Sequence, residues 1–314
     1  MSDAARPTVV ALGTLHPRLA SGIADRFHVL HAENDPATIT PEMRAARAIV
    51  THGGVGASAA VMDALPALEM IGLMAVGYDA VDVAHAREKG IGVSNTPDVL
   101  TDDVADLAVG LIYAVIRRIA VNDRFVREGR WAAGGTVPFC GRVTGSRIGI
   151  LGLGRIGQAI AGRLAPVAGE ILYHSRRARP ESPFTFVPDI IAFAHACDIM
   201  VVATSGGPEA HGLVDTGVIE ALGPNGTLIN ISRGGVIDES ALVAALVDGR
   251  LGGAGLDVFA HEPHVPEALL GLDNVVLQPH QGSATVNTRN AMADLVLANL
   301  DAHFAGQPLP TPVA

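Results

Sequence analysis

The chain has 314 residues, 49% of them hydrophobic and 4% aromatic, and its 22 basic and 32 acidic side chains give a formal net charge of −10. At roughly 150 residues a domain, this length predicts two domains. The acidic balance argues against nucleic acid or an anionic membrane as the main partner. Cys140 and Cys197 belong to no metal-binding or disulfide motif, so we predict no metal site and favour a reducing, cytoplasmic location.

No apolar run approaches the roughly 18 residues of a membrane span, and the first residues lack the charged-then-apolar order of a signal peptide. Short apolar runs instead alternate with helical patterns. We predict strands over 8–13, 48–53, 69–77 and 91–95, and helices near 17–25, 58–65 and 80–89. This alternation predicts a parallel sheet.

A helical pattern then covers residues 101–131, with Thr101 as a plausible N-cap, acidic residues in the first turn and apolar periodicity through Ile119. These features predict one long helix. A segment containing glycine and proline follows over 132–145 and interrupts the pattern before the next strand.

A second alternating series begins at Arg147. Its predicted strands cover 147–154, 170–175, 198–205, 227–232, 254–259 and 274–280, and a last helical pattern covers 285–304. Six strands in this rhythm suit a doubly wound sheet of the Rossmann type. The predicted fold class is therefore α/β, with two domains.

The first strand of this series leads into a glycine turn. Gly152, Gly154 and Gly157, with Arg155 and Ile156 between the last two, form a GxGxxG pattern directly after a strand and before a helix. Glycines at these positions permit a tight turn and a close approach, and the helix N-terminus offers amide hydrogens to a pyrophosphate. The turn predicts a dinucleotide-binding site.

About 20 residues after such a turn, NAD sites commonly place an acid that binds the adenosine ribose. Here that position holds Ser175, followed by Arg176 and Arg177. A carboxylate would repel a 2′-phosphate, whereas a hydroxyl can donate a hydrogen bond to it and guanidinium groups can grip its oxygens. We therefore predict that NADP(H) is preferred over NAD(H).

Charged residues follow three later strands. Arg233 comes after a strand that ends at Ser232, Asp257 and Glu262 follow the next one, and His280 follows the last. Because the carboxyl ends of strands in a doubly wound sheet face the ligand crevice, these residues could converge there. Reduction of a 2-oxo acid needs a proton donor, a carboxylate that holds the imidazolium, and a guanidinium that binds the substrate carboxylate.

Four longer motifs, GLGRIGQ, NISRGGVIDESALVAAL, GAGLDVFAHEP and LQPHQGSAT, resemble the signatures of the D-isomer-specific 2-hydroxyacid dehydrogenases, and the resemblance extends along nearly the whole chain. The SRR turn and AVGYDAVD are most similar to the NADPH-dependent glyoxylate/hydroxypyruvate and hydroxyphenylpyruvate reductases. The resemblance implies NADPH-dependent reduction of a small 2-oxo acid, such as glyoxylate, hydroxypyruvate or an aryl pyruvate, to the D-2-hydroxy acid.

The resemblance also implies residue roles. Arg233 would bind and polarise the 2-oxo acid, Glu262 would pair with the histidine, His280 would donate the proton, and Asp257 would hold the nicotinamide carboxamide. Gly54, Val76 and Gly77 would line the substrate pocket with Arg233. The expected cofactor-binding residues are Gly152, Gly154, Arg155, Ile156, Gly157, Ser175, Arg176, Arg177, Thr204, Ile231, Ser232 and Asp257.

Family members fold a flavodoxin-like substrate domain into which the nucleotide domain is inserted. The resemblance thus implies a substrate domain over 1–99, a dinucleotide-binding domain over 100–286, and a C-terminal helix and tail over 287–314 that return to the substrate domain. It also implies a homodimer joined through the nucleotide domain, for which the long helix from Thr101 and the loop with Trp131 and Phe139 are suited.

Two alternatives stay open. One is a relative that uses another 2-hydroxy acid, such as phosphoglycerate, although the substrate loop over 51–58 has no Arg or Lys. The other is a dinucleotide-sensing corepressor of the same fold, which can retain the Arg, Glu and His residues. Gln281 and the 204–214 segment depart from the family's usual pattern and bear on substrate choice.

Overall fold

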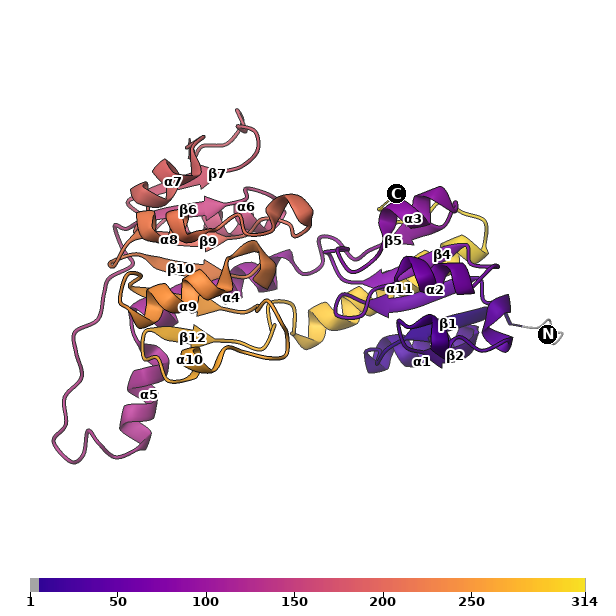
Figure 1. Cartoon of the computed structure of the whole chain (residues 1–314), viewed down its shortest axis with the longest axis horizontal. Helices are drawn as coiled ribbons and strands as arrows, with labels where there is room; N and C mark the ends of the chain where they lie inside the picture. The colour runs from indigo at the N-terminus through magenta and orange to yellow at the C-terminus, as the bar shows by residue number, and fades with distance from the viewer. Residues whose placement is uncertain (1–5, 314) are drawn as a thin grey trace. The chain divides into compact units, whose positions relative to one another are not determined.

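The computed structural model describes residues 6–313, which form two compact units (Figure 1). The first is built from the chain up to Leu100 and from Thr285 onward, and the second from residues 101–284. The predicted crossings at 99/100 and 286/287 differ from these bounds by one and two residues. Between residues 6 and 313, no helix is both long enough and apolar enough to cross a membrane.

The first unit contains a five-stranded parallel sheet in the order β2-β1-β3-β4-β5, which is the flavodoxin-like order. Its central strands are almost fully buried, as expected for a parallel sheet covered on both faces. Its strands are β1 (Thr8–Leu12), β2 (His28–Ala32), β3 (Ala48–His52), β4 (Met70–Met74) and β5 (Gly92–Ser94). The edge strand β2 was not predicted, because its short HVLHA run shows little of the pattern of a buried strand.

Helices complete the first unit. They are α1 (Pro17–Arg26), α2 (Ala59–Ala64), α3 (Val83–Glu88) and α11 (Val286–Phe304). The C-terminal helix α11 packs against α1 and β4, and Gly72 in β4 allows this approach, because a Cβ atom there would lie 3.1 Å from a methyl carbon of Val296. Residues from the two ends of the chain therefore share one core.

The second unit contains a seven-stranded parallel sheet in the order β12-β11-β10-β9-β6-β7-β8. The strand order reverses between β6 and β9, which makes this the switch point where ligands bind in doubly wound folds. The predicted Rossmann-type fold is confirmed. Its strands are β6 (Arg147–Leu151), β7 (Glu170–His174), β8 (Thr185–Phe186), β9 (Ile199–Val202), β10 (Thr227–Asn230), β11 (Gly253–Leu256) and β12 (Val275–Leu277).

Helices cover both faces of this sheet, with α7, α8 and α9 on the near face in Figure 1 and α4 passing behind it together with α6. Many of the buried side chains of this unit form one hydrophobic core between the sheet and α7 to α9. The helices are α4 (Thr101–Ile116), α5 (Ile119–Arg127), α6 (Arg155–Leu164), α7 (Ile190–Ala196), α8 (Thr216–Leu222), α9 (Glu239–Val247) and α10 (Glu267–Leu270).

The prediction of one long helix from Thr101 was wrong. Helix α4 ends at Ile116 and α5 begins at Ile119, because Arg118 adopts the left-handed conformation with φ of 52°. A left-handed residue ends a helix, and it is usually glycine. Because this residue is an arginine and not a glycine, the sequence shows no helix-ending signal at position 118, and the helical periodicity continues past it.

Candidate active site

The glycine turn between β6 and α6 has the geometry of a dinucleotide site. Gly152 has φ of 98°, and a Cβ atom there would lie 2.7 Å from the backbone of Thr204, in the loop that follows β9. A Cβ atom on Gly157 would overlap the carbonyl oxygen of Gly152, so the helix packs directly on the turn. Gly154 is the N-cap of α6 and has open space around its Cα. The first turn of α6 can therefore receive a pyrophosphate.

The turn after β7 carries the residues predicted to bind a 2′-phosphate. The Ser175 hydroxyl donates a hydrogen bond of 2.7 Å to the carbonyl of Arg177, so its proton closes the turn. Arg176 forms an ion pair of 2.8 Å with Glu209, and both side chains are highly exposed. Arg177 is also exposed and, within residues 6–313, forms no ion pair. The arginines, rather than the hydroxyl, are thus the groups available to an anion.

A buried amide holds the turn that carries Arg233. Asn230, the last residue of β10, accepts hydrogen bonds from the backbone N–H and the hydroxyl of Ser232 and donates one to the carbonyl of Arg233. The guanidinium of Arg233 donates to the carbonyl of Ser232 at 2.8 Å. Asn230 was not among the predicted site residues, although a polar residue at the end of a buried strand is a sign that could have indicated it.

Gly234 ties this turn to the loop that follows β11. A Cβ atom on Gly234 would overlap the carbonyl of Phe259 and the N–H of Ala260, so the two backbones touch there. Glu239, the first residue of α9, accepts a hydrogen bond of 2.9 Å from the Ala260 N–H and so holds the same loop. The turn that carries Arg233 and the loop that carries Glu262 are therefore in direct backbone contact.

Glu262 and His280 form a hydrogen-bonded pair. Oε2 of Glu262 lies 2.8 Å from Nδ1 of His280, and Oε1 accepts a hydrogen bond of 3.0 Å from the Phe259 N–H. Burial would raise the pKa of Glu262, but these hydrogen bonds and the charges of His280 and Arg233 hold that pKa below its ordinary value. The carboxylate is therefore ionised at neutral pH and accepts a hydrogen bond from the N–H at Nδ1, which leaves Nε2 as the ring nitrogen for a substrate.

Asp257 fixes the backbone beside the histidine. Its side chain is 1% exposed, and its two oxygens accept hydrogen bonds from the N–H groups of Gln281 at 2.6 Å and Gly282 at 2.9 Å. Burial raises the pKa of Asp257, while the two amide hydrogen bonds and the charge of His280 act in the opposite direction. His280 itself has φ of 55°, so its loop holds a conformation that side chains rarely adopt.

The predicted substrate loops lie in the first unit, at the carboxyl edge of its sheet. Gly54 follows β3, and Val76 and Gly77 follow β4. The two loops are adjacent, because a Cβ atom on Gly53 would lie 3.0 Å from that of Ala75. The side-chain amide of Asn95 donates a hydrogen bond of 2.8 Å to the carbonyl of Val76 and holds this loop.

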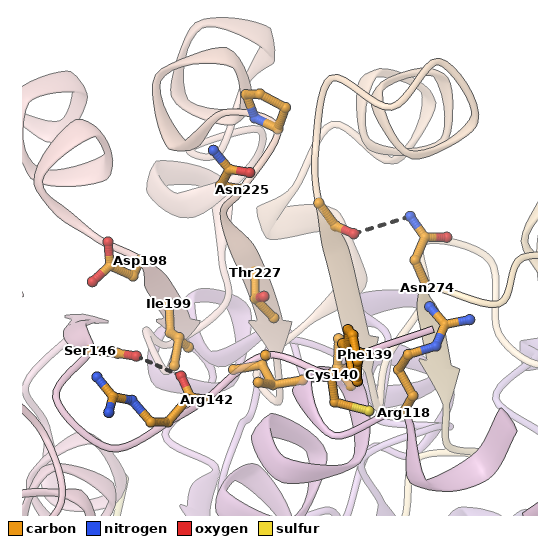
Figure 2. A pocket seen from close by; sticks show the side chains of 15 residues that line it. Arg118, Phe139, Cys140, Arg142, Ser146, Asp198, Ile199, Asn225, Thr227 and Asn274 are labelled. Carbon is orange, nitrogen blue, oxygen red and sulfur yellow. Dashed lines mark hydrogen bonds between the residues drawn. The ribbon is translucent and has the colours of Figure 1, made fainter. Parts of the chain in front are cut away.

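A cavity of about 320 Å³ lies elsewhere in the second unit (Figure 2). Its lining includes Asp198, Thr227 and Asn274, which directly precede strands or begin them. It therefore opens at the amino edge of the sheet, whereas Arg233, Glu262 and His280 follow strands at the carboxyl edge. This cavity is not the catalytic site.

The comparison with known families matches this geometry. Residues 109–282 match the model of the D-isomer specific 2-hydroxyacid dehydrogenase, NAD binding domain. The chain belongs to the D-isomer specific 2-hydroxyacid dehydrogenase family. It is therefore an oxidoreductase with an NAD(P)-binding domain, and the glycine turn, Arg233, Glu262 and His280 all lie within the matched range.

Relatives of this dehydrogenase family align along most of the chain. The hydroxyphenylpyruvate reductase of Plectranthus scutellarioides is 54% identical over 85% of each chain. The glyoxylate/hydroxypyruvate reductase A of Arabidopsis thaliana is 47% identical, covering 94% of this chain and 95% of that one. The crystal structure of the NADPH-dependent glyoxylate/hydroxypyruvate reductase of Sinorhizobium meliloti with NADP and malonate has a TM-score of 0.95 at 43% identity, covering 99% of this chain and 97% of that one.

Proposed function

We propose that this dehydrogenase reduces a small 2-oxo acid to the D-2-hydroxy acid with NADPH. The observation that carries the proposal is the 2.8 Å pair between Glu262 and His280, with the charge of Arg233 acting on the same carboxylate. These residues supply the proton donor, its counter-ion and a cation for the substrate. The relatives named as reductases of glyoxylate, hydroxypyruvate and hydroxyphenylpyruvate support the substrate class.

The proposed mechanism assigns one task to each side chain. Bound NADPH supplies the hydride that reduces the carbonyl carbon. Arg233 binds the carboxylate of the 2-oxo acid and polarises its carbonyl, so that negative charge on the carbonyl oxygen is stabilised. His280 donates the proton to this oxygen from Nε2, and Glu262 stabilises the protonated imidazole through Nδ1. Gly54, Val76 and Gly77 are proposed to receive the substrate carboxylate with backbone amides.

The cofactor site fits a dinucleotide by its shape and its charge. At Gly152 and Gly157 a side chain would collide with the backbone of the turn, so the turn is tight. Helix α6 begins there, and the space beside Gly154 is open. Arg155, Ile156, Thr204, Ile231 and Ser232 are proposed to line the same site, and Thr204 already lies against Gly152. For Asp257, whose oxygens bind the 281–282 backbone, we propose that it supports the site around the nicotinamide carboxamide.

The preference for NADPH over NADH rests on the turn after β7. Ser175 closes this turn, Arg177 is exposed without an ion pair within residues 6–313, and Arg176 is bound only in a surface ion pair that contributes at most about 1 kcal/mol. A 2′-phosphate, which carries more charge than a carboxylate, would compete well for both guanidinium groups. The turn over 175–177 has no acidic residue that could accept hydrogen bonds from a ribose diol.

The test is a panel of 2-oxo acids assayed with NADPH and with NADH. We expect saturable oxidation of NADPH with glyoxylate or hydroxypyruvate, a D-2-hydroxy acid product, and a higher kcat/KM for NADPH than for NADH. An enzyme that prefers NADH would remove the assignment of Arg176 and Arg177. A protein that binds NADPH tightly but reduces none of the panel would instead be a dinucleotide sensor.

We further propose a homodimer formed through the second unit. Residues 119–139 expose Ile119, Val126, Val137, Trp131 at 69% and Phe139 at 104%, an apolar set that a partner subunit would cover. Phe139 also lies at the cavity of Figure 2. Light scattering should give twice the monomer mass, and Phe139→Asp should yield monomer. A cytoplasmic location is proposed because Cys140 and Cys197 are both free thiols.

A further inference from the structure

Two peptide groups in the loop after β4 are each held by their carbonyl oxygen. The carbonyl of Ala75 accepts a hydrogen bond of 2.8 Å from the Thr96 N–H, and the carbonyl of Val76 accepts one of 2.8 Å from the side-chain amide of Asn95. Both peptide bonds are trans, so the N–H group of each points opposite to its carbonyl. The N–H groups of Val76 and Gly77 therefore point away from Asn95 and Thr96.

The N–H groups of Val76 and Gly77 are available as donors. Among residues 6–313 neither N–H has a hydrogen-bond partner, and both residues are partly exposed. Consecutive N–H groups on one side of a loop form a concave site for an anion. A carboxylate, which accepts several hydrogen bonds and donates none, is the group that this pair fits. The direction of both donors depends on the groups that hold the two carbonyls.

Asn95 is itself held by the segment over 311–313. Its backbone N–H donates to the carbonyl of Thr311 at 3.3 Å, and its own carbonyl accepts a hydrogen bond of 2.7 Å from the Thr311 hydroxyl. The segment also pairs with β5, because the Val313 N–H donates to the carbonyl of Val93 at 2.8 Å. It therefore adds to the edge of the sheet directly beside Asn95.

A buried asparagine on α11 fixes Thr311. Asn299 is 0% exposed, and its Oδ1 accepts a hydrogen bond of 3.1 Å from the Thr311 N–H. Its Nδ2 donates to the Thr311 hydroxyl at 2.9 Å and to the carbonyl of Leu295 at 2.7 Å. The Thr311 hydroxyl thus accepts from Asn299 and donates to Asn95. A continuous chain of hydrogen bonds leads from the core to the loop with Val76.

We propose that Asn95 is a positioning residue for carboxylate binding, and that Asn299 and Thr311 act through it. By holding the Val76 carbonyl, Asn95 sets the direction of the Gly77 N–H. This inference rests on the proposed function, in which the loop with Val76 and Gly77 receives the substrate carboxylate. Such amides bind the carboxylate in the ground state and in the transition state alike, so loss of their orientation should raise KM more than it lowers kcat.

The experiment compares Asn95→Ala and Thr311→Val with the unmodified enzyme, using NADPH and the best substrate of the 2-oxo acid panel. Asn95→Ala removes the donor to the Val76 carbonyl, so we expect KM to rise about tenfold while kcat changes less than about threefold. Thr311→Val keeps the shape of the side chain and removes only its hydroxyl, so KM should rise about threefold. A variant that was only less stable would lower kcat and leave KM unchanged. That pattern, or no change in either constant, overturns the proposal.

The double variant tests whether Thr311 acts through Asn95. If it does, Thr311→Val should have no further effect on KM in the Asn95→Ala background, whereas independent effects would overturn the chain of contacts. The matched control is Asn274→Ala in the second unit, which also removes a side-chain amide bound to a backbone carbonyl, that of Gly252, and should leave KM unchanged. Thermal unfolding shows whether each variant is folded. Should Asn95→Ala fail to fold, Thr311→Val alone decides by the same ratio of KM to kcat.

Binding of oxalate, with NADP⁺ present, gives a readout that does not depend on turnover. In an NMR titration the backbone amide signals of Val76 and Gly77 should shift as oxalate binds to the unmodified protein, and the Kd should be about tenfold higher in Asn95→Ala. This result without reduction of any 2-oxo acid would contradict the proposed function and support the role of Asn95. Turnover of a 2-oxo acid with equal oxalate affinity in the two proteins would support the function and overturn the role of Asn95.

Discussion

Nδ1 of His280 lies 2.8 Å from Oε2 of Glu262, although the two residues are 18 positions apart and come from loops after different strands. Each partner is fixed separately. The Phe259 N–H binds Glu262, and the buried carboxylate of Asp257 holds the backbone that follows His280. The pair is therefore set by the ends of β11 and β12, and changes at either anchor should disturb catalysis.

His280→Ala should remove the proton donor. General acid catalysis by a positioned side chain contributes about 10²-fold or more, so kcat should fall by at least that factor while NADPH binding stays close to normal. Stopped-flow measurement of NADPH oxidation, with fluorescence titration of cofactor binding, checks both. A near-normal kcat would mean that another group donates the proton.

Glu262→Gln keeps the shape of the side chain but removes its charge. The protonated form of His280 loses its counter-ion, so kcat at neutral pH should fall about tenfold. Steady-state turnover of a 2-oxo acid substrate tests this. An unchanged kcat would show that Glu262 acts only as a spacer.

The same carboxyl group also affects stability. Because the pKa of Glu262 is lowered in the folded protein, its ionised form stabilises the fold above the ordinary value of 4.5, and this contribution is lost as pH falls through the lower, folded pKa. Urea unfolding at a series of pH values should thus show a steeper acid loss for the unmodified protein than for Glu262→Gln. Equal slopes would place the stabilisation elsewhere.

Most residues of this candidate site could be predicted from the sequence, because they belong to short motifs that follow strands. Arg233, Glu262 and His280 each follow a strand, and in a parallel sheet these ends share one edge, so their approach could be expected from order alone. The break at Arg118 and the edge strand β2 could not be predicted, because they depend on a backbone conformation and on tertiary packing that no residue type at these positions indicates. Asn230 differs from them, because a polar residue at the end of a buried strand is a sign in the sequence itself.

Gly234→Ala tests the backbone contact between the Arg233 turn and the Glu262 loop. An added methyl group would overlap the carbonyl of Phe259, and overpacking of this kind typically costs about 1–3 kcal/mol. We expect this loss of unfolding free energy, together with a fall in kcat/KM. Gly235→Ala is the matched control, because its Cβ atom would lie 3.6 Å from His211, an ordinary contact. Equal effects in the two variants would contradict the assignment.

Arg177→Gln and Glu209→Gln should change cofactor use in opposite directions. Removal of the Arg177 guanidinium should lower kcat/KM for NADPH about tenfold with little effect on NADH, the magnitude of a hydrogen bond to a charged group. Glu209→Gln frees Arg176 from its ion pair and removes a negative charge, so NADPH use should improve a few-fold. Arg179→Gln, in the same turn, is the control. A loss with both cofactors in Arg177→Gln would point to a structural role.

Asp257→Asn tests whether the buried carboxylate holds the catalytic loop. An amide nitrogen cannot accept a hydrogen bond, so one of the Gln281 and Gly282 N–H groups would face a donor, at a cost of about 1–3 kcal/mol for a buried unsatisfied group. Since the pKa of Asp257 is raised, the carboxylate stabilises the fold less as pH rises through its ordinary value toward its folded value. The loss of unfolding free energy in Asp257→Asn, measured by urea unfolding, should therefore be smaller at pH 7 than the lost hydrogen bond alone would give. In the same variant kcat should fall, because His280 is displaced.

Asp238→Asn is the matched control, since Asp238 caps α9 through the Ala241 N–H and asparagine caps equally well. If Asp257→Asn retained full activity, the position of His280 would not depend on the 281–282 backbone.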